Sequence, residues 1–512
     1  MSTGAETSRG RRAGALAQLA AAGVVMFLCL FHLTSYPVTW YDEGSHLHVP
    51  KTFVRHGVYS DISSEGFRYY GPTIGVGPTV LLPIAGVFSL ASVGLLQARL
   101  VIVAYLLGTF LLCWHLGRWL GGPRFAWIAT ALLVTSRGVG LLENGRQVLG
   151  EVPAFFFMGA GLLLWFTGWE RASWGRLTAV GVLLGLAVVT KTQFMIMLAP
   201  ALLLAWLANL VYYRGVPQRT FVVPGLAVGI LFAAWQAYVI LFLGPGAASE
   251  NLALYRAATA AAATVFSPAL MRRAVGELLS LKVYLGWLLP ALAYGVFLAA
   301  PRRRDGQQWG VLLLIAGVNL AWYVVASVSW IRYAFPALAI SSLFVARFFH
   351  DLTGGFRLGA GGSGTDSDLG HTLGLRTVLL GTLLVMIVVP LGQNARAIIA
   401  PGPNDPLAMA AHLTEHVPVS AVIETWEPEL GFLTDHRYHY PPQRSLYEAV
   451  THIWLNGPSP ADAYRFDQAG KPDYVLVGPF ARWVGMYPPD RLDAAYAPVV
   501  SIGAYQLLAR KP

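Results

Sequence analysis

The segment TWYDEGSHLHVP, residues 39–50, places adjacent carboxylates at Asp42 and Glu43 directly after a long apolar run. A charged side chain costs ~2.5–3.5 kcal/mol or more at the centre of a bilayer, so such a segment needs water, partners or a function. We interpret it as the floor of a site at the membrane surface. The alternative is a plain hydrated loop, with Trp40 and Tyr41 in an aromatic belt.

Composition indicates a membrane protein. The chain has 512 residues, of which 55% are hydrophobic and 12% charged, and its mean hydropathy is +0.55. Soluble domains carry about 25% charged residues. The net charge of +10 does not indicate nucleic-acid binding, because the basic residues lie in short loops between apolar runs. The two cysteines, Cys29 and Cys113, lie within apolar runs, which excludes a disulfide framework.

The apolar runs set the number of predicted membrane crossings, since a crossing helix needs about 20 residues. The first run follows Arg9, Arg11 and Arg12 and is too long for the core of a typical signal peptide, so it is predicted to be a retained anchor. The runs lie near 13–33, 73–92, 97–117, 124–142, 151–169, 176–190, 193–213, 220–243, 282–300, 309–328, 332–350 and 375–393.

Basic loops decide which runs cross, because cytoplasmic loops are enriched in Lys and Arg. These loops are GRWLGGPR (117–124), WERASWGR (169–176), YYRGVPQR (212–219) and PRRRDGQQ (301–308). All four become cytoplasmic only if the run 73–92, which contains Gly77, Pro78 and Pro83, does not cross. We therefore predict about 11 crossings, with a broken juxtamembrane or re-entrant helix at 73–92 and a cytoplasmic loop at 351–374.

This topology gathers the remaining polar segments on the outer face of the membrane. They are the first outer loop 34–96, the segment 141–151, Lys191, the loop 244–281 and the segment 328–333. We expect a site to form where these segments meet.

Composition shifts near residue 394, which separates a transmembrane part, 1–393, from a C-terminal tail, 394–512. Short β-rich runs bounded by Gly and Pro alternate with helical segments in the tail, which predicts a small extracytoplasmic α/β domain. We interpret it as a cap or an acceptor-docking module. Four histidines offer no strong metal-ligand spacing. They are His412, His416, His436 and His439.

Carboxylates are the candidate catalytic groups. Adjacent residues of a helix point about 100° apart, so we assign Asp42 as the base that accepts the proton of an incoming hydroxyl and Glu43 as a supporting or metal-facing group. Glu151 opens the fourth crossing and is predicted to face Asp42 across the cavity; capping of that helix is the alternative. His46 and His48 are interpreted as structural or surface residues, although an HxH pair on a strand can bind metal.

Cations and a tyrosine on the same face are candidate phosphate ligands. We select Arg146, which could also pair with Glu151, together with Lys191, Arg332 and Tyr333. A lysine at a helix end can instead extend along the apolar surface toward water. Other outer-face cations are interpreted as ordinary surface charge: Arg68, Arg99, Arg137, Arg256, Arg272, Arg273 and Lys282.

The chain resembles the GT-C fold glycosyltransferases that use polyprenyl-phosphate sugars, which include protein O-mannosyltransferases and lipid A aminoarabinose transferases. The resemblance covers about 13–350 and rests on the order and spacing of several segments. They are YDEG, YYGPTIGVGPTVLLPIAGVF, QARLVIVAYLLGTFLLCWHLGRWLGG, GRQVLGEVPAFFF, GLAVVTKTQFMIMLAP and RYAFPAL.

The resemblance implies that Asp42 is the catalytic base and that Glu151 lines the site. Relatives often place a lysine before the juxtamembrane prolines, whereas this chain has Gly77, so Lys191 or Arg332 is expected to contact the phosphate. No counterpart of the zinc ligands of some relatives is found, so no metal ligand is assigned, although a divalent metal is not excluded.

The resulting expectation is an inverting glycosyltransferase in the bacterial inner membrane, active on its outer face. It would move a sugar from a polyprenyl-phosphate donor to a hydroxyl of a protein, glycan or lipid acceptor, among membrane lipids and without nucleic acid. The rival class is a polytopic transporter or lipid-linked sugar flippase. A non-catalytic scaffold of envelope assembly is a third class.

Overall fold

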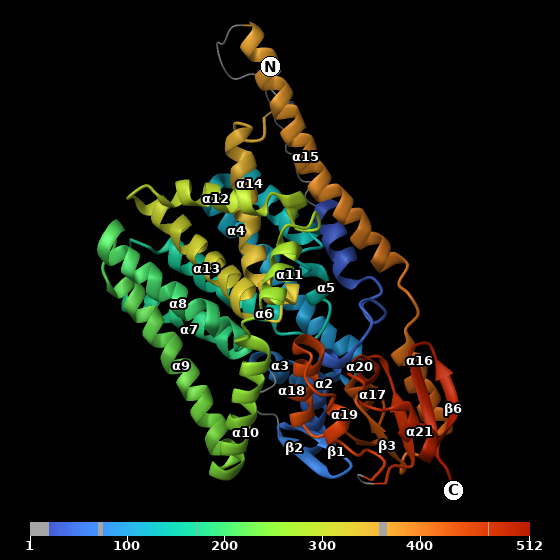
Figure 1. Cartoon of the computed structure of the whole chain (residues 1–512). Coiled ribbons are helices and arrows are strands. Elements are labelled where there is room, and N and C mark those ends of the chain that lie inside the picture. The colour runs from blue at the N-terminus through green and yellow to red at the C-terminus, as the bar shows by residue number, and fades with distance from the viewer. Residues whose placement is uncertain (1–19, 70–74, 171–172, 358–365, 469–470) are drawn as a thin grey trace.

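The computed structural model describes residues 20–512 except 70–74, 171–172, 358–365 and 469–470. Helices form an elongated bundle, and a region that contains a sheet packs against one end of it (Figure 1). The predictions for Arg9, Arg11 and Arg12, and for the start of the first apolar run, lie outside the described residues.

Among the described residues, six helical segments are long and apolar enough to cross a membrane, and shorter apolar helices accompany them. The six are Leu95–Thr135, Gln193–Tyr213, Arg219–Leu243, Arg304–Ala326, Ile331–Leu352 and Gly374–Ile399. The shorter ones are Ala20–Leu30, Pro78–Ala91, Glu151–Thr167, Trp174–Thr190 and Leu288–Ala299. The chain is therefore a multi-pass membrane protein, while the number of about 11 crossings stays a prediction.

Helix α4 (Leu95–Thr135) joins the two predicted runs 97–117 and 124–142 through a sharp kink. Gly122 has φ 84° at this kink, in the left-handed region that glycine adopts most readily, and Pro123 follows it. A Cβ at Gly117 would lie 2.9 Å from the Cα of Ala126, so glycine lets the two halves of α4 pack closely.

Helices α6 (Glu151–Thr167) and α14 (Phe335–Leu352) pack against α4, and the other bundle helices pack onto these and onto one another with apolar side chains. Helix α7 (Trp174–Thr190) packs against α6 and α9 (Arg219–Leu243), and α13 (Arg304–Ala326) packs against α8 (Gln193–Ala208) and α12 (Leu288–Ala299). Further elements are α5 (Leu141–Asn144), α10 (Pro245–Ala258), α11 (Pro268–Leu278) and α15 (Asp366–Ile399).

Helix α3 (Pro78–Ala91) occupies the run predicted to be juxtamembrane, part of which, 73–74, lies outside the described residues. Its 14 residues span about 21 Å, which is shorter than the ~30 Å hydrocarbon core of a bilayer. It packs between α2 (Tyr41–His56) and the start of α4. The short length suits a helix at the membrane surface.

The C-terminal region contains a five-stranded mixed sheet in the order β4-β3-β5-β7-β6. Strand β3 (Val422–Thr425) runs parallel to β4 (Arg437–His439) and β5 (Tyr474–Val477), and β7 (Tyr505–Arg510) is antiparallel to β5 and β6 (Tyr496–Ile502). Its helices are α16 (Asp405–His416), α17 (Pro428–Leu433), α18 (Arg444–Leu455), α19 (Pro460–Ala463), α20 (Pro479–Trp483) and α21 (Pro489–Ala495). Helix α15 continues to Ile399, beyond the expected end of the last apolar run.

Helix α2 links the bundle to this C-terminal region. Lys51 Nζ donates to the carbonyls of Gly431, Phe432 and Thr434 at 2.9, 3.0 and 2.6 Å, which satisfies acceptors at the end of α17. A Cβ at Gly44 would lie 2.2 Å from the backbone nitrogen of Glu429, so any larger residue would force α2 and α17 apart. The first outer loop and the C-terminal region therefore form one packed unit.

The predicted topology can be tested by cysteine labelling in a variant in which Cys29 and Cys113 are replaced by Ala. We expect a membrane-impermeant maleimide to label Val93→Cys in intact cells and Pro123→Cys only after permeabilisation, because the first half of α4 separates the two sites. Labelling of both sites in intact cells would contradict the predicted orientation.

Candidate active site

Four side chains form a connected array of ion pairs. Arg332 Nη2 donates to Asp42 Oδ2 at 2.5 Å, and Arg332 Nε lies 3.4 Å from Glu151 Oε1. Lys191 Nζ lies 3.1 Å from the same Glu151 oxygen. The structure thus brings together four residues that the sequence selected separately, in the order Asp42–Arg332–Glu151–Lys191.

Each member of the array stands at or near a helix end. Asp42 lies in the first turn of α2, and Glu151 is the first residue of α6. Lys191 is the C-cap residue of α7, and Arg332 lies in the 3-10 turn Ile331–Ala334 just before α14. Carboxylates near helix N-termini and a cation at a C-terminus suit the helix dipoles. Four helices thus converge on one polar centre.

The array retains buried polar atoms without a hydrogen-bond partner among the described residues. They are Nη1 and Nε of Arg332 and both carboxylate oxygens of Glu151. Nε of Arg332 and Oε1 of Glu151 lie 3.4 Å apart in an ion pair, and Oε1 also pairs with Lys191. The other two of these atoms are Nη1 of Arg332 and Oε2 of Glu151. Because buried polar groups are normally satisfied, these two atoms mark a place for a polar ligand.

Aromatic rings enclose the arginine of the array. The Arg332 guanidinium lies 4.2 Å from the ring centroid of Trp330 and 5.5 Å from that of Trp40. Trp40 Nε1 donates to Gln147 Oε1 at 3.0 Å, which fixes its ring. Tyr333 stacks on Trp322 with ring centroids 5.6 Å apart. Stacking on aromatic faces is typical of arginine at binding sites, and the sequence reading assigned neither tryptophan to this role.

Glu43 lies outside the array, in a buried cluster of its own. Arg99 donates to its two oxygens from Nε at 2.9 Å and Nη2 at 2.5 Å, and the backbone nitrogen of Val148 donates to Oε1 at 3.0 Å. Both side chains are fully buried. The interpretation of Arg99 as surface charge is therefore wrong, and Glu43 ties α2 to α4 and to the segment that leads into α6.

Arg146 is also occupied elsewhere, so the structure does not support its predicted pairing with Glu151. It donates to the carbonyls of Leu28, Phe31 and Tyr36 from a fully buried position. It thus caps the C-terminal end of the helix Ala20–Leu30. A free carbonyl at a helix end leaves no periodic signal in a sequence, which is why the arginine resembled a phosphate ligand.

The two histidines of the opening segment make structural contacts. His46 Nδ1 contacts the carbonyl of Val148 at 2.8 Å, and burial lowers the pKa of His46 to about 4. His48 Nε2 contacts the carbonyl of Pro428 at 2.8 Å, and its Nδ1 lies 2.9 Å from Asp61 Oδ1. The residues that the structure describes contain no group of three or more His, Cys, Asp or Glu side chains placed to bind a metal ion.

The Glu43–Arg99 pair leads to a stability prediction. Glu43→Ala leaves a fully buried guanidinium without its carboxylate, and breaking a buried pair in this way costs about 3–5 kcal/mol. We expect a large fall in the thermal midpoint of the purified protein in detergent. The matched control is Glu170→Ala, because Glu170 pairs with Arg304 at 2.7 Å but is 74% exposed; such pairs contribute ~0–1 kcal/mol. Equal effects of the two variants would contradict this assignment.

Two buried carboxyls in the C-terminal region make stability depend on pH. Tyr505 donates to Glu429 Oε1 at 2.6 Å and the backbone nitrogen of Ala481 donates to Glu427 Oε1 at 2.9 Å. Burial raises the pKa of both side chains above the ordinary value of 4.5, for Glu429 to about 7. The folded state therefore favours their protonated forms, and this stabilisation is present below about pH 4.5 and lost as pH rises through about 7.

We expect the thermal midpoint to fall between pH 5 and pH 8, and the double variant Glu427→Gln, Glu429→Gln to flatten that dependence. Glu415→Gln is the control, since Glu415 is 77% exposed in the same region. A profile that keeps its slope in the double variant would show that other groups cause it.

No protein-family model and no curated protein sequence matches this chain. Its structure is similar to that of ArnT from Cupriavidus metallidurans in the apo state, with TM-score 0.63 and 14% identity over 98% of each chain. It is similar to ArnT bound to undecaprenyl phosphate, with TM-score 0.61 and 13% identity over 97% of this chain and 98% of that chain.

A third similar structure is the archaeal oligosaccharyltransferase AglB from Archaeoglobus fulgidus, in complex with an inhibitory peptide and a dolichol-phosphate. The TM-score is 0.55 and the identity 13%, over 96% of this chain and 74% of that chain. These proteins are glycosyltransferases of the GT-C class. At such low identity the likeness concerns the fold, and the chain has a GT-C-like fold.

Proposed function

We propose that this protein is an inverting glycosyltransferase that moves a sugar from a polyprenyl-phosphate donor to a hydroxyl acceptor on the outer face of the membrane. The observation that carries the proposal is the array Asp42–Arg332–Glu151–Lys191, in which two carboxylates and two cations converge at helix ends within a GT-C-like fold. The acceptor stays open at this level.

The cations suit the phosphate of the donor. Lys191 and Arg332 both pair with Glu151, which places two positive charges near each other. Arg332 Nη1 has no hydrogen-bond partner among the described residues. Guanidinium groups bind phosphate oxygens through charge-assisted hydrogen bonds. The similar structures of ArnT and AglB hold undecaprenyl phosphate and a dolichol-phosphate, which supports a lipid phosphate as the ligand here.

Asp42 is assigned as the base. Without substrate its carboxylate is held by Arg332. When the donor phosphate engages the guanidinium, part of this interaction shifts to the phosphate, and a carboxylate oxygen becomes available to the acceptor. Asp42 then takes the hydroxyl proton while the acceptor oxygen attacks the anomeric carbon in line. The bond from that carbon to the phosphate oxygen breaks, and the configuration at the carbon inverts.

The leaving group is the polyprenyl phosphate, which departs with the electron pair of the broken bond. Lys191 and Arg332 stabilise the negative charge that develops on it, and fixed cations in a site shielded from water are effective at this task. Glu151 pairs with both cations and thereby sets their separation. No proton donor to the leaving group is required, because phosphate is stable as an anion.

A divalent metal is not part of this mechanism, because the donor set fits one poorly. Asp42 and Glu151 are each engaged by cationic side chains, whereas hard divalent cations prefer several free oxygen ligands. The sequence left a divalent metal open, and adding chelator to the transfer assay tests whether the reaction depends on one.

The rival function, transport or flipping of a lipid-linked sugar, would use intramembrane charges as a relay. The array stands instead at helix ends beside α2 and the C-terminal region. This position favours chemistry at the membrane surface, and we retain the transporter only as an outcome of the test.

The test combines lipid identification with transfer. The full chain is purified, and the lipid that copurifies with it is identified by mass spectrometry. The protein is then incubated with radiolabelled mannose, glucose or arabinose linked to undecaprenyl phosphate. Membranes of cells that lack the protein serve as the source of acceptor. We expect a copurified polyprenyl phosphate and transfer of label to membrane material. Movement of the labelled lipid across vesicles without any transfer would overturn the proposal in favour of a transporter.

A further inference from the structure

A second space, lined by both apolar and polar side chains, lies apart from the array, between the bundle and the C-terminal region. It is a cavity of about 780 Å³ bounded by α10, by α18 and by the hairpin of β1 (Ser60–Ser63) and β2 (Gly66–Tyr69). Ligand sites commonly have volumes of ~300–1,000 Å³. None of the four members of the array lines this cavity, so it needs a separate explanation.

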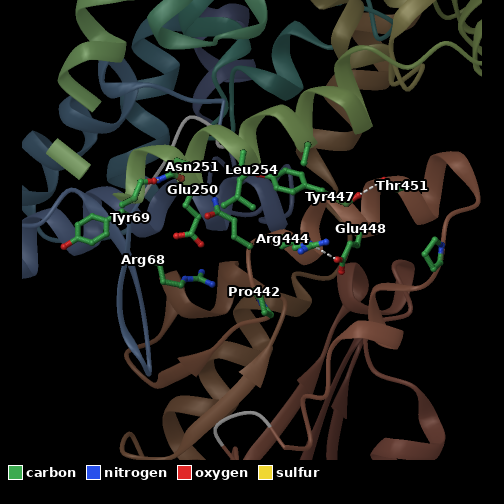
Figure 2. Close-up of a pocket in the computed structure, with 15 residues that line it drawn as sticks. Arg68, Tyr69, Glu250, Asn251, Leu254, Pro442, Arg444, Tyr447, Glu448 and Thr451 are labelled. Atoms are coloured by element: carbon green, nitrogen blue, oxygen red, sulfur yellow. Dashed lines mark hydrogen bonds and ion pairs between the residues drawn. The ribbon is translucent and has the colours of Figure 1, made fainter. Parts of the chain in front are cut away.

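Two helix faces form opposite walls of the cavity. The α10 wall includes Ala247, Glu250, Leu254 and Ala257, whose spacing of three and four positions is that of one helical face, and Asn251 and Ala253 beside them. The α18 wall presents Arg444, Tyr447, Glu448 and Thr451 in the same way. Figure 2 shows these two sets of side chains with Arg68 and Tyr69 of the hairpin beside them.

The hairpin β1–β2 contacts the C-terminal region through Arg68 and the end of α9 through Tyr69. Arg68 donates to Asp61 Oδ2 from Nε at 3.1 Å and also from Nη2, and its guanidinium lies 4.5 Å from the ring centroid of Tyr440. Tyr69 contacts the ring of Phe242 at the end of α9, with centroids 5.9 Å apart. The interpretation of Arg68 as ordinary surface charge is therefore wrong, since it is a fixed part of the cavity wall.

The cations of the cavity wall are neutralised by carboxylates. Its described lining residues include two arginines, Arg68 and Arg444, and two glutamates, Glu250 and Glu448. Arg68 is paired with Asp61, and Arg444 Nε lies 3.3 Å from Glu448 Oε1. Glu250 is then a further carboxylate in the lining, and its charge disfavours an anionic ligand, so this lining favours an uncharged one.

The remaining lining combines rings with planar polar groups. Tyr69 is 46% exposed, Glu250 and Asn251 line the cavity from α10, and Arg444 and Glu448 line it from α18. A pyranose ring has faces made of C–H groups and a rim of hydroxyls. Aromatic faces match the former, and amide, carboxylate and guanidinium groups match the latter. The lining therefore fits a neutral saccharide.

Side-chain contacts connect the cavity wall to α2, the helix that carries the assigned base, Asp42. Asp61, which holds Arg68, also lies 2.9 Å from His48 Nδ1, and His48 belongs to α2, the helix of Asp42. His48 in turn contacts the carbonyl of Pro428 and the hydroxyl of Tyr440 in the C-terminal region. Helix α2 therefore carries the assigned base, Asp42, and also holds the cavity wall through His48 and Asp61.

We propose that this cavity between the hairpin β1–β2, α10 and α18 is the acceptor subsite and that it holds a neutral, hydroxyl-rich glycan chain. The inference rests on the proposed function, and it narrows the acceptor from any hydroxyl compound to a carbohydrate. The C-terminal region then acts as the module that docks the acceptor, through α18.

The test measures binding of fluorescently labelled mannotetraose, cellotetraose and chitotetraose to the purified full chain. The protein carries Asp42→Asn, so that no turnover interferes. Ala253→Trp fills the cavity from an exposed position of α10, and Arg444→Ala removes one wall group. Matched controls are Leu252→Trp, on the same helix but outside the lining and 47% exposed, and Arg437→Ala, an exposed arginine of β4.

We expect at least one neutral tetrasaccharide to bind, with a Kd raised at least about tenfold by Ala253→Trp and Arg444→Ala and unchanged by the two controls. The proposal is overturned if none of the three binds, if the cavity variants bind like the parent protein, or if a phosphorylated mannotetraose or a Ser/Thr-rich peptide binds in their place. Failure of the proposed function is a separate result, because it is seen as absence of label transfer from the polyprenyl-phosphate sugars.

Discussion

Replacing Asp42 by Asn is expected to lower sugar transfer by about 10²–10⁴-fold, the usual contribution of a positioned general base. Asparagine has nearly the same shape and still accepts a hydrogen bond from Arg332, which now donates to Asp42 at 2.5 Å. It cannot take a proton at neutral pH. The change therefore removes the chemistry and leaves the geometry of the array in place.

The measurement is the initial rate of label transfer by equal amounts of purified protein, with the thermal midpoint as a check on folding. Asp467→Asn serves as the matched control, because Asp467 also pairs with an arginine, Arg465, at 3.0 Å but lies in the C-terminal region, outside the array and the cavity. A transfer rate of the Asp42 variant within a few-fold of the parent protein would end the assignment of Asp42 as the base.

The second large effect is expected at Arg332, where Arg332→Lys should lower transfer by about 10²–10³-fold. Lysine keeps one positive charge but loses the planar fork that reaches Asp42 and Glu151 together. Loss of one preorganised stabiliser of developing charge typically costs that much in rate. We expect the KM for the donor to rise as well, because the same group binds the phosphate before and during the reaction.

Arg304→Lys is the matched control for this change. Arg304 also pairs with a carboxylate, Glu170, at 2.7 Å and also lies over a tryptophan, with its guanidinium 4.8 Å from the ring centroid of Trp119. It stands outside the array, so its variant should transfer at the parent rate. If both lysine variants lose activity equally, the effect of Arg332 is a general loss of packing and the phosphate assignment fails.

The bundle helices could be predicted from the sequence because hydropathy is a property of each segment by itself. The runs 151–169 and 220–243 correspond closely to α6, Glu151–Thr167, and α9, Arg219–Leu243. The sequence also separated the two halves of α4, where Gly122 and Pro123 form the kink. It did not reveal that α2 would pack against α17, since this contact joins segments more than 370 residues apart.

The candidate site was predicted in part, and its errors share one cause. Asp42 and Arg332 form a pair across 290 positions of the chain, and each was selected as a polar residue on the outer face. Glu43 and Arg146 were selected by the same criterion and Arg99 was interpreted as surface charge, yet Glu43 and Arg99 form a buried salt bridge and Arg146 donates to backbone carbonyls. A sequence shows that a charge lies near a membrane surface, but not which group neutralises it.

The sequence by itself determined that this is a helical membrane protein and that its unusual charges lie at or near the ends of the apolar runs, because the cost of placing charge in hydrocarbon acts on every segment independently. Tertiary structure alone decided which of these charges meet. Asp42 pairs with Arg332, whereas its neighbour Glu43 pairs with Arg99. Adjacent residues of a helix point to different sides, and only the packing of the helices determines which side chain each of them meets.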